Sequence, residues 1–195
     1  MKRWIGLVAG ALMACAIPME FAMADAAADK ERLAQVIGQK STLVFDSFDN
    51  DTALKLGLAM VKYAHDTKAP QSVFDIRRNG QILFRASLPG SSVDNEHWVR
   101  EKIATMQRFL VSSERKKLEY RALIGADWLK AYPNGSGDAV RFWNLSDEEA
   151  AGLVGGGFPI FLKGTGYVGT IVASGGPDGS DHDLIVAVLK AFLNT

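Results

Sequence analysis

The sequence predicts an α+β fold in which an antiparallel β-sheet, built from two β-hairpins, is flanked by α-helices. Two pairs of segments rich in β-forming residues are each joined by a turn sequence, Asn79-Gly80 in the first and Gly164-Thr165-Gly166 in the second. Segments with the apolar spacing of helices lie before, between and after these hairpins. Tightly joined strands pair antiparallel and helices then cover them, which favours this class over a doubly wound parallel sheet.

Two helices are expected before the first hairpin. The first covers residues 29–40, and residues 42–45 form a short apolar, extended segment after it. The second begins at the cap sequence Asp49-Asn50-Asp51 and runs to about His65. Its apolar residues occupy two faces, which is typical of a well-buried helix; they are Leu54, Leu58 and Val61 on one face and Leu56, Met60 and Tyr63 on the other.

The first hairpin pairs residues 72–78 with residues 81–87, and a loop over residues 88–92 follows it. The next helix begins near residues 94–95, and its apolar positions are spaced by four, three and four residues: Val99, Ile103, Met106 and Leu110. Ser112-Ser113 is expected to interrupt this helix before another one that extends to about Tyr132.

The second hairpin follows the most linker-like stretch of the chain, residues 134–137, which is too short to separate two domains. Ser146 with Glu149 three residues later is a capping-box signature and predicts a brief helix. Residues 158–163 and 167–174 then supply the two strands.

A final helix is expected after the glycine-rich loop of residues 175–179. Ser180 and Asp183 have the spacing of a second capping box. The apolar face of this helix comprises Ile185, Val188, Leu189 and Phe192.

The N-terminus has the organisation of a secretory signal peptide. Lys2 and Arg3 precede an uncharged apolar stretch over residues 4–17, and Ala22-Met23-Ala24 supplies the small residues of a cleavage site. The apolar stretch is too short for a comfortable membrane span. We therefore expect residues 1–24 to be removed after Ala24 and residues 25–195 to form one domain in the periplasm or outside the cell.

A second interpretation of this segment is a lipoprotein signal. Leu12-Met13-Ala14-Cys15 resembles a lipoprotein box in which Cys15 would be lipidated, although Met13 departs from the usual pattern. Because Cys15 is the only cysteine, cleavage at Ala24 leaves a domain without disulfides, thiolate metal sites, covalent c-type haem or a cysteine nucleophile. The formal net charge is zero and no basic run contains interleaved aromatic residues, which argues against a nucleic-acid partner.

Several sequence blocks together resemble the haem-degrading-domain family of GlcG, HbpS and PduO C-terminal-like proteins, and most closely a largely uncharacterised branch of it. The blocks are Phe48–Leu54, Ile76–Gln81, Leu88–Asn95 with Trp98, Gly155–Ile160, Lys163–Gly166, Val168–Thr170, Ser174-Gly175 and Asp181-His182. The resemblance implies a small sheet flanked by helices, assembly into dimers or larger rings and, for some relatives, haem binding. The chain departs from the family pattern at Val154, where a histidine is frequent, and over residues 132–153.

No catalytic residue is predicted. Gly164-x-Gly166-x-x-Gly169 matches the dinucleotide-binding fingerprint by letter, but that motif requires a helix after the glycines, and here a strand is expected. The chain contains no G-x-S-x-G, H-E-x-x-H or P-loop sequence. Asp49 and Asp51 with Asn50 could suggest a metal cluster, but a helix cap is the simpler interpretation.

The predicted ligand contacts are therefore histidines, cations and one tryptophan. His182 is the first candidate for binding haem iron, because it begins the last helix after a glycine-rich loop, and His97 is the second. The cations Arg77, Arg78, Lys102, Arg108 and Lys163 could contact haem propionates or a small anion, or could form solvated faces or ion pairs at an interface. Trp98 is expected either to line a pocket or to cover the core.

The leading hypothesis is an exported, oligomeric module that binds haem or another small ligand. Haem breakdown is its enzymatic form and would require bound iron, oxygen and an electron donor. The alternative is a non-catalytic scaffold or interaction protein of the cell envelope, in which the glycine-rich loops serve assembly.

Overall fold

The computed structural model describes residues 19–69, 72–124, 144–146, 149, 152–177 and 179–194. Its elements follow the predicted order: α1 Met19–Thr42, α2 Asn50–Asp66, β1 Val73–Arg78, β2 Gln81–Ser87, α3 Val93–Phe109, α4 Ser113–Ile124, β3 Gly157–Leu162, β4 Gly166–Ser174 and α8 Ser180–Leu193. Over these residues the strands form one sheet in the order β2-β1-β4-β3, and every neighbouring pair is antiparallel. The predicted α+β class is confirmed.

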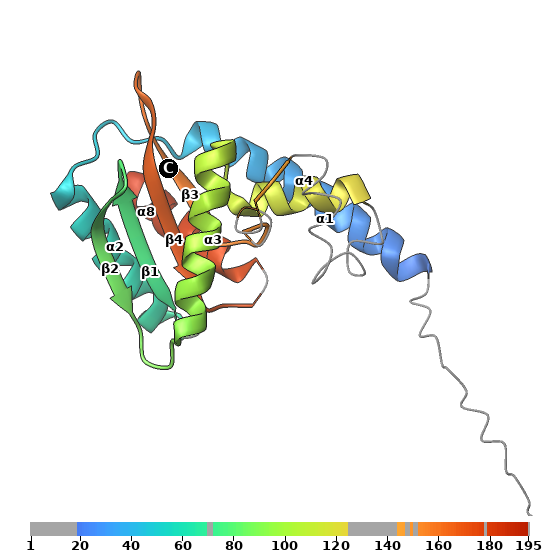
Figure 1. Ribbon diagram of the computed structural model, residues 1–195, viewed down its shortest axis with the longest axis horizontal. Coiled ribbons are helices and arrows are strands. Elements are labelled where there is room, and N and C mark those ends of the chain that lie inside the picture. The colour runs from blue at the N-terminus through green and yellow to red at the C-terminus, as the bar shows by residue number, and fades with distance from the viewer. Residues whose placement is uncertain are drawn as a thin grey trace, which may run out of the picture.

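Helices cover both faces of the sheet (Figure 1), with α2 and α8 on one face and α3 on the other. Successive side chains of a strand point to opposite faces, so Phe74 and Ile76 of β1 join the larger core beneath α2 and α8. Val73 points the other way and packs with residues of α3 such as Val99 and Met106. The sheet therefore separates two cores, and α3 lies over the smaller one.

Helices α1 and α4 pack side by side and extend away from the layered part (Figure 1). α1 begins at Met19, ten residues before the predicted start, so the predicted cleavage position after Ala24 lies within this helix. The remainder of the predicted signal peptide lies outside the described residues. Among the helices that the structure describes, none combines the length and the apolar character needed to cross a bilayer.

Both predicted turns are present, and each uses left-handed backbone conformations. Asn79 and Gly80 have φ angles of 50° and 84°, as expected for the turn of a two-residue hairpin. Gly164 and Gly166 also have positive φ values, and β4 continues directly from Gly166. The glycines that match the dinucleotide fingerprint therefore belong to a hairpin and its strand.

The predicted caps are only partly correct. Asp49 caps α2, because its Oδ1 accepts a hydrogen bond from the Thr52 amide at 2.8 Å. The capping box of Ser146 and Glu149 is also present, with reciprocal bonds of 2.8 and 3.2 Å. Helix α3 ends at Leu110, which has a φ of 53° and separates it from α4, close to the predicted interruption.

The capping box predicted for Ser180 and Asp183 is wrong. Gly179, with a φ of 81°, occupies the N-cap of α8, and no side chain caps this helix end. The Ser180 hydroxyl donates to the Pro177 carbonyl, while the Asp183 carboxylate accepts a bond from Arg32 of α1 at 2.7 Å. A glycine in a left-handed conformation and a partner from a distant helix thus replace the local pattern. The end predicted for α4, near Tyr132, lies outside the described residues.

Candidate functional site

A pocket of about 510 Å³ lies where α3 and α4 meet two glycine-rich segments. The segments are residues 153–155, which lead into β3, and residues 174–177 with Gly179, which connect β4 to α8. The helices contribute Asp94, Asn95, Trp98 and Lys102 from α3, Lys117, Tyr120 and Arg121 from α4, and Asp181 from α8. The volume is in the range of sites for small organic ligands.

The α3 side of the pocket follows from helical spacing. Asp94, Trp98 and Lys102 are four residues apart and therefore share one face of α3. The Trp98 indole Nε1–H donates to Asp94 Oδ2 at 3.0 Å, which fixes the ring against the helix. The indole is only partly covered, so an aromatic surface is available at the pocket wall.

A buried ion pair connects α3 to the start of α8. Lys102 Nζ lies 3.1 Å from Asp181 Oδ2 and also donates to the Ala173 carbonyl at 2.8 Å. Asp181 Oδ1 accepts the amide of Gly176 at 2.9 Å, and Oδ2 accepts that of Gly175 at 3.3 Å. The lysine and aspartate side chains are only 4% and 9% exposed, so the two charges compensate each other where little water reaches them. The pair thereby fixes the glycine loop that forms one wall.

Glycine is required where the strands approach this ion pair. Gly156 has a φ of 108°, and a Cβ at this position would lie 2.6 Å from Asp181 Cβ and 2.8 Å from Lys102 Nζ. A Cβ at Gly176 would lie 2.2 Å from the Ser180 hydroxyl. The glycine run predicted as a family block therefore allows backbone and charged side chains to pack closely at the pocket.

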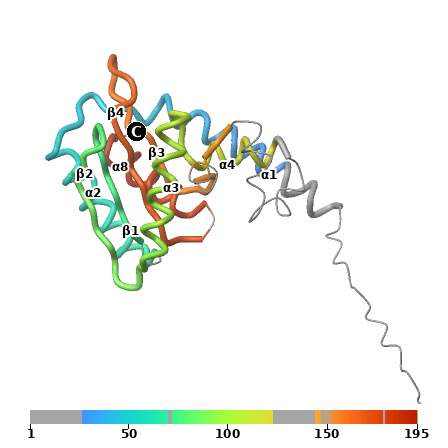
Figure 2. Tube along the Cα trace, viewed as in Figure 1, coloured from blue at the N-terminus to red at the C-terminus, as the bar shows by residue number. Residues whose placement is uncertain are grey.

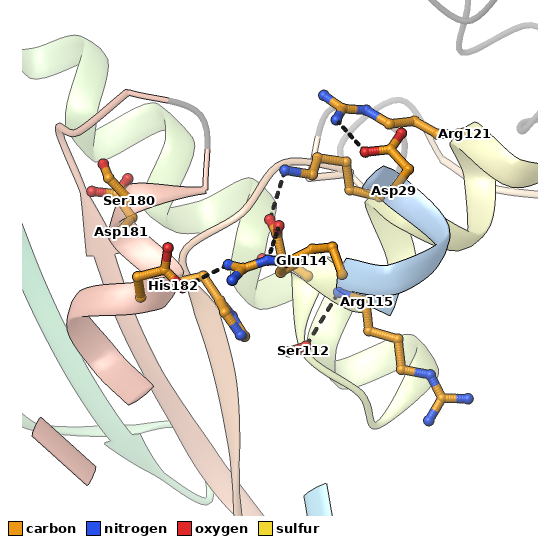
Figure 3. A network of polar contacts seen from close by, with 12 residues as sticks. Asp29, Ser112, Glu114, Arg115, Arg121, Ser180, Asp181 and His182 are labelled. Carbon is orange, nitrogen blue, oxygen red and sulfur yellow. Dashed lines mark hydrogen bonds and ion pairs between the residues drawn. The ribbon is translucent and has the colours of Figure 1, made fainter. Parts of the chain in front are cut away.

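Glu114 is the centre of a second polar network, shown in Figure 3. Its carboxylate lies 2.7 Å from Lys117 Nζ, and its other oxygen lies 3.4 Å from Arg32 Nε of α1. Arg121 is held 3.4 Å from Asp29, also on α1. Helix α1 thus anchors α4, the helix that presents Lys117 and Arg121 to the pocket.

Two of the predicted ligand contacts, Trp98 and Lys102, line the pocket. Arg78 instead donates to the Phe48 carbonyl at 2.6 Å on the α2 side of the sheet. Lys163 forms an exposed ion pair with Asp46 at 2.7 Å in the β3–β4 turn, which projects beyond the sheet in Figure 2. The length of β4, about 25 Å, separates this turn from Ser174 at the pocket.

The other predicted cations do not line the pocket either. Arg77 binds the fully buried Asp75 at 2.7 Å, and Arg85 binds the same carboxylate at 2.7 Å. Arg108 forms a pair with Glu149 at 3.4 Å. These arginines form ion pairs within the chain.

The two histidines predicted to bind haem iron lie outside the pocket lining. His97 is half exposed on the neighbouring face of α3, with Nδ1 3.4 Å from Glu101 Oε1. His182 is fully buried. Its Nε2 lies 2.8 Å from Gln39 Oε1 of α1, and its ring is 6.1 Å from that of Phe158. A ligand contact for either histidine stays a prediction.

Burial governs the protonation of His182. Removal from water disfavours the charged imidazolium and, with the nearby charge of Arg32, lowers the pKa of His182 to about 3. The ring is therefore neutral near pH 7, and with Gln39 presenting its carbonyl oxygen it carries its proton on Nε2. Nδ1 has no hydrogen-bond partner among the described residues.

Sequence reasoning missed most of the pocket. Asp181 was recognised only as part of a family block, and Lys117, Tyr120 and Arg121 were not singled out. Asp94, Trp98 and Lys102 carry a readable signal, their i, i+4 spacing. Lys102 and Asp181 are 79 positions apart, and nothing in the sequence pairs them. Over the described residues, no group of three or more histidine, cysteine, aspartate or glutamate side chains could hold a metal ion.

The model of the HbpS-like haem-degrading proteins matches residues 48–190, most of the chain. The chain belongs to the HbpS-like family. A UPF0303 protein of Streptomyces coelicolor is 34% identical over 161 residues, covering 83% of this chain and 93% of that relative. This supports the predicted placement in a largely uncharacterised branch.

Solved structures show that the HbpS-like fold is shared more widely. The crystal structure of the Ybr137w protein matches with a TM-score of 0.69 at 23% identity, over 83% of this chain and 87% of that one. A crystal structure of a PduOC:heme complex matches with a TM-score of 0.53 at 19% identity, over 76% and 94%. At these identities the likeness establishes the fold alone.

Proposed function

We propose that this protein binds haem or a related flat, carboxylate-bearing ligand in the pocket between α3 and α4. The observation that carries the proposal is the composition of this pocket. Trp98 supplies aromatic surface, while Lys117 and Arg121 supply cations for carboxylates. Haem is the first candidate because the chain belongs to the HbpS-like haem-degrading family and shares its fold with PduOC, which was crystallised with haem.

The described residues match only part of a haem molecule. Pocket size, aromatic faces and cations fit the macrocycle and its propionates. The iron is not matched in the same way, because histidine is absent from the described lining. When bound, haem would supply iron-centred redox chemistry; the protein's own contribution in this proposal is binding and orientation.

Titration with hemin tests the proposal. We expect a saturable shift of the Soret band with one hemin per chain, and Arg121→Gln should weaken binding by about tenfold, because a hydrogen bond to a charged group is worth roughly 1.5–3 kcal/mol. Lys163→Gln is the matched control, since this cation lies in the distant β3–β4 turn and should leave binding unchanged. Absence of a Soret shift at micromolar hemin would contradict haem binding.

We also propose that the protein is exported. The support is the order of Lys2-Arg3, the apolar stretch and Ala22-Met23-Ala24 at the N-terminus. Mass spectrometry of the protein from its native host should give a mature chain that begins at Asp25. A lipidated Cys15 would favour the lipoprotein alternative, and an intact Met1 would contradict export.

Self-association is proposed on two surface features. The outer edge of β2 has no strand partner among the described residues, whereas Phe45 pairs with the outer edge of β3. On α2, Leu54 and Leu58 lie one turn apart and are 47% and 56% exposed. These features also favour the alternative function, a scaffold that acts through assembly.

Light scattering tests self-association. The mature chain should form dimers or larger assemblies. Leu54→Lys/Leu58→Lys should shift the population toward monomers, because charges replace apolar contact area. Val93→Lys is the control and should have no effect, because this apolar residue is 86% exposed and lies on α3, away from α2. A wild-type monomer at high micromolar concentration would argue against assembly.

A further inference from the structure

We infer that the pocket recognises the flat face and the carboxylates of its ligand, and that it binds an iron-free porphyrin as tightly as haem. The inference rests on the proposed function and narrows its ligand class to planar, carboxylate-bearing macrocycles regardless of a central metal. It depends on where the histidine and sulfur-containing side chains lie and on the chemistry of the pocket wall.

The histidine positions can be settled for the whole chain. The sequence contains three histidines, and all of them lie in the described part. His65 is exposed near the end of α2, which covers the opposite face of the sheet from α3. His182 is fully buried against Gln39 and Phe158, and His97 faces Glu101 on the neighbouring face of α3. No residue outside the described part can supply an imidazole.

Among the side chains that the structure describes, no sulfur-containing one belongs to the pocket lining. The sole cysteine is Cys15, in the segment proposed to be removed on export. Met60 and Met106 are fully buried in the two cores, and the remaining methionines lie at or before position 23. Histidine, cysteine and methionine are the usual protein ligands of haem iron, together with tyrosine in some enzymes.

Tyr120 is the described lining residue whose side chain is of a type that ligates haem iron in some enzymes. Its side chain is 97% buried in α4, so most of the phenol packs within the protein. Lys102 is committed to Asp181 and the Ala173 carbonyl. Within the lining that the structure describes, iron coordination would therefore depend on one largely buried phenol, which a conservative substitution can remove.

The wall offers contacts that do not require a metal. The indole of Trp98 is held by Asp94, and glycine backbone from residues 155 and 175–176 presents peptide groups without side chains. Aromatic faces and flat backbone suit the two sides of a planar ring system. Lys117 and Arg121, anchored through Glu114 and Asp29, suit carboxylates at its edge.

Parallel titrations of the full mature chain test the inference. Hemin is followed by its Soret band and protoporphyrin IX by its fluorescence, for wild type, Tyr120→Phe and Arg121→Gln. We expect the dissociation constants of protoporphyrin IX and hemin to agree within a factor of five. Tyr120→Phe should leave the ratio of these two constants unchanged, and Arg121→Gln should weaken the binding of both ligands about tenfold. The same folded samples should have matching circular dichroism spectra.

The outcomes separate the inference from the function on which it rests. Hemin binding more than fivefold tighter than protoporphyrin IX would overturn the inference and leave haem binding standing. A drop of that preference in Tyr120→Phe would then identify the phenol as the iron ligand. Failure of both ligands to bind would overturn the proposed function and the inference together.

Discussion

Asp181→Ala is expected to lower the free energy of unfolding by about 3–5 kcal/mol, because it removes one partner of a buried ion pair with Lys102. The lysine side chain is 4% exposed, so water cannot take over the role of the carboxylate without a rearrangement of α3 or α8. The amides of Gly175 and Gly176 also lose their acceptor. Urea denaturation followed by circular dichroism measures the change.

Two variants show whether the loss of this ion pair is the cause. Asp183→Ala removes an exposed carboxylate two positions away on α8, where its pair with Arg32 is solvent-screened and should be worth less than about 1 kcal/mol. Lys102→Met/Asp181→Leu removes both buried charges and should recover most of the stability lost in Asp181→Ala. If the double variant is as unstable as the single one, charge pairing is not the explanation.

His182→Ala is expected to lower the free energy of unfolding by about 2–4 kcal/mol, because it leaves a cavity at a fully buried position. The variant also removes the partner of the Gln39 amide, 2.8 Å from Nε2. Thermal and urea denaturation measure the loss. His65→Ala, at an exposed position on α2, is the matched control and should stay within about 0.5 kcal/mol of wild type.

The same residue should make stability depend on pH. The pKa of His182 is lowered to about 3 in the folded protein, below its ordinary value of 6.5, so the unfolded chain binds the proton more readily. The stability contributed by the neutral ring is therefore complete above about pH 6.5 and is lost as the pH falls toward 3, by up to about 1.4 kcal/mol per pH unit. His182→Leu should flatten this dependence relative to wild type; an unchanged slope would contradict the assignment.

The hairpins and most helices could be predicted because their signals are local. Asn79-Gly80 adopts left-handed conformations that few other residue pairs accept, and Asp49 caps α2 through an amide three residues away. Such interactions involve neighbours in the chain, so they are readable from residue order. The capping box predicted at Ser180 failed because Arg32, far away in the sequence, binds Asp183.

The site could be predicted only where it follows one helix face. Trp98 and Lys102 were found, and they lie four residues apart on α3. His182 was placed next to a glycine loop by the sequence, yet Gln39 of α1 and Phe158 of β3 enclose it. Burial depends on which distant elements pack over a residue, and the glycine loop gives no indication of that.

The sequence by itself determined the fold class, the two hairpins and the family resemblance. Only the tertiary structure decided which charges meet. Lys102 reaches Asp181 across 79 positions, and α1 anchors the helix that carries Lys117 and Arg121. The physical reason is the separation in sequence of the interacting residues. Turns and caps depend on hydrogen bonds between near neighbours, whereas a pocket depends on the packing of elements that are distant in the chain.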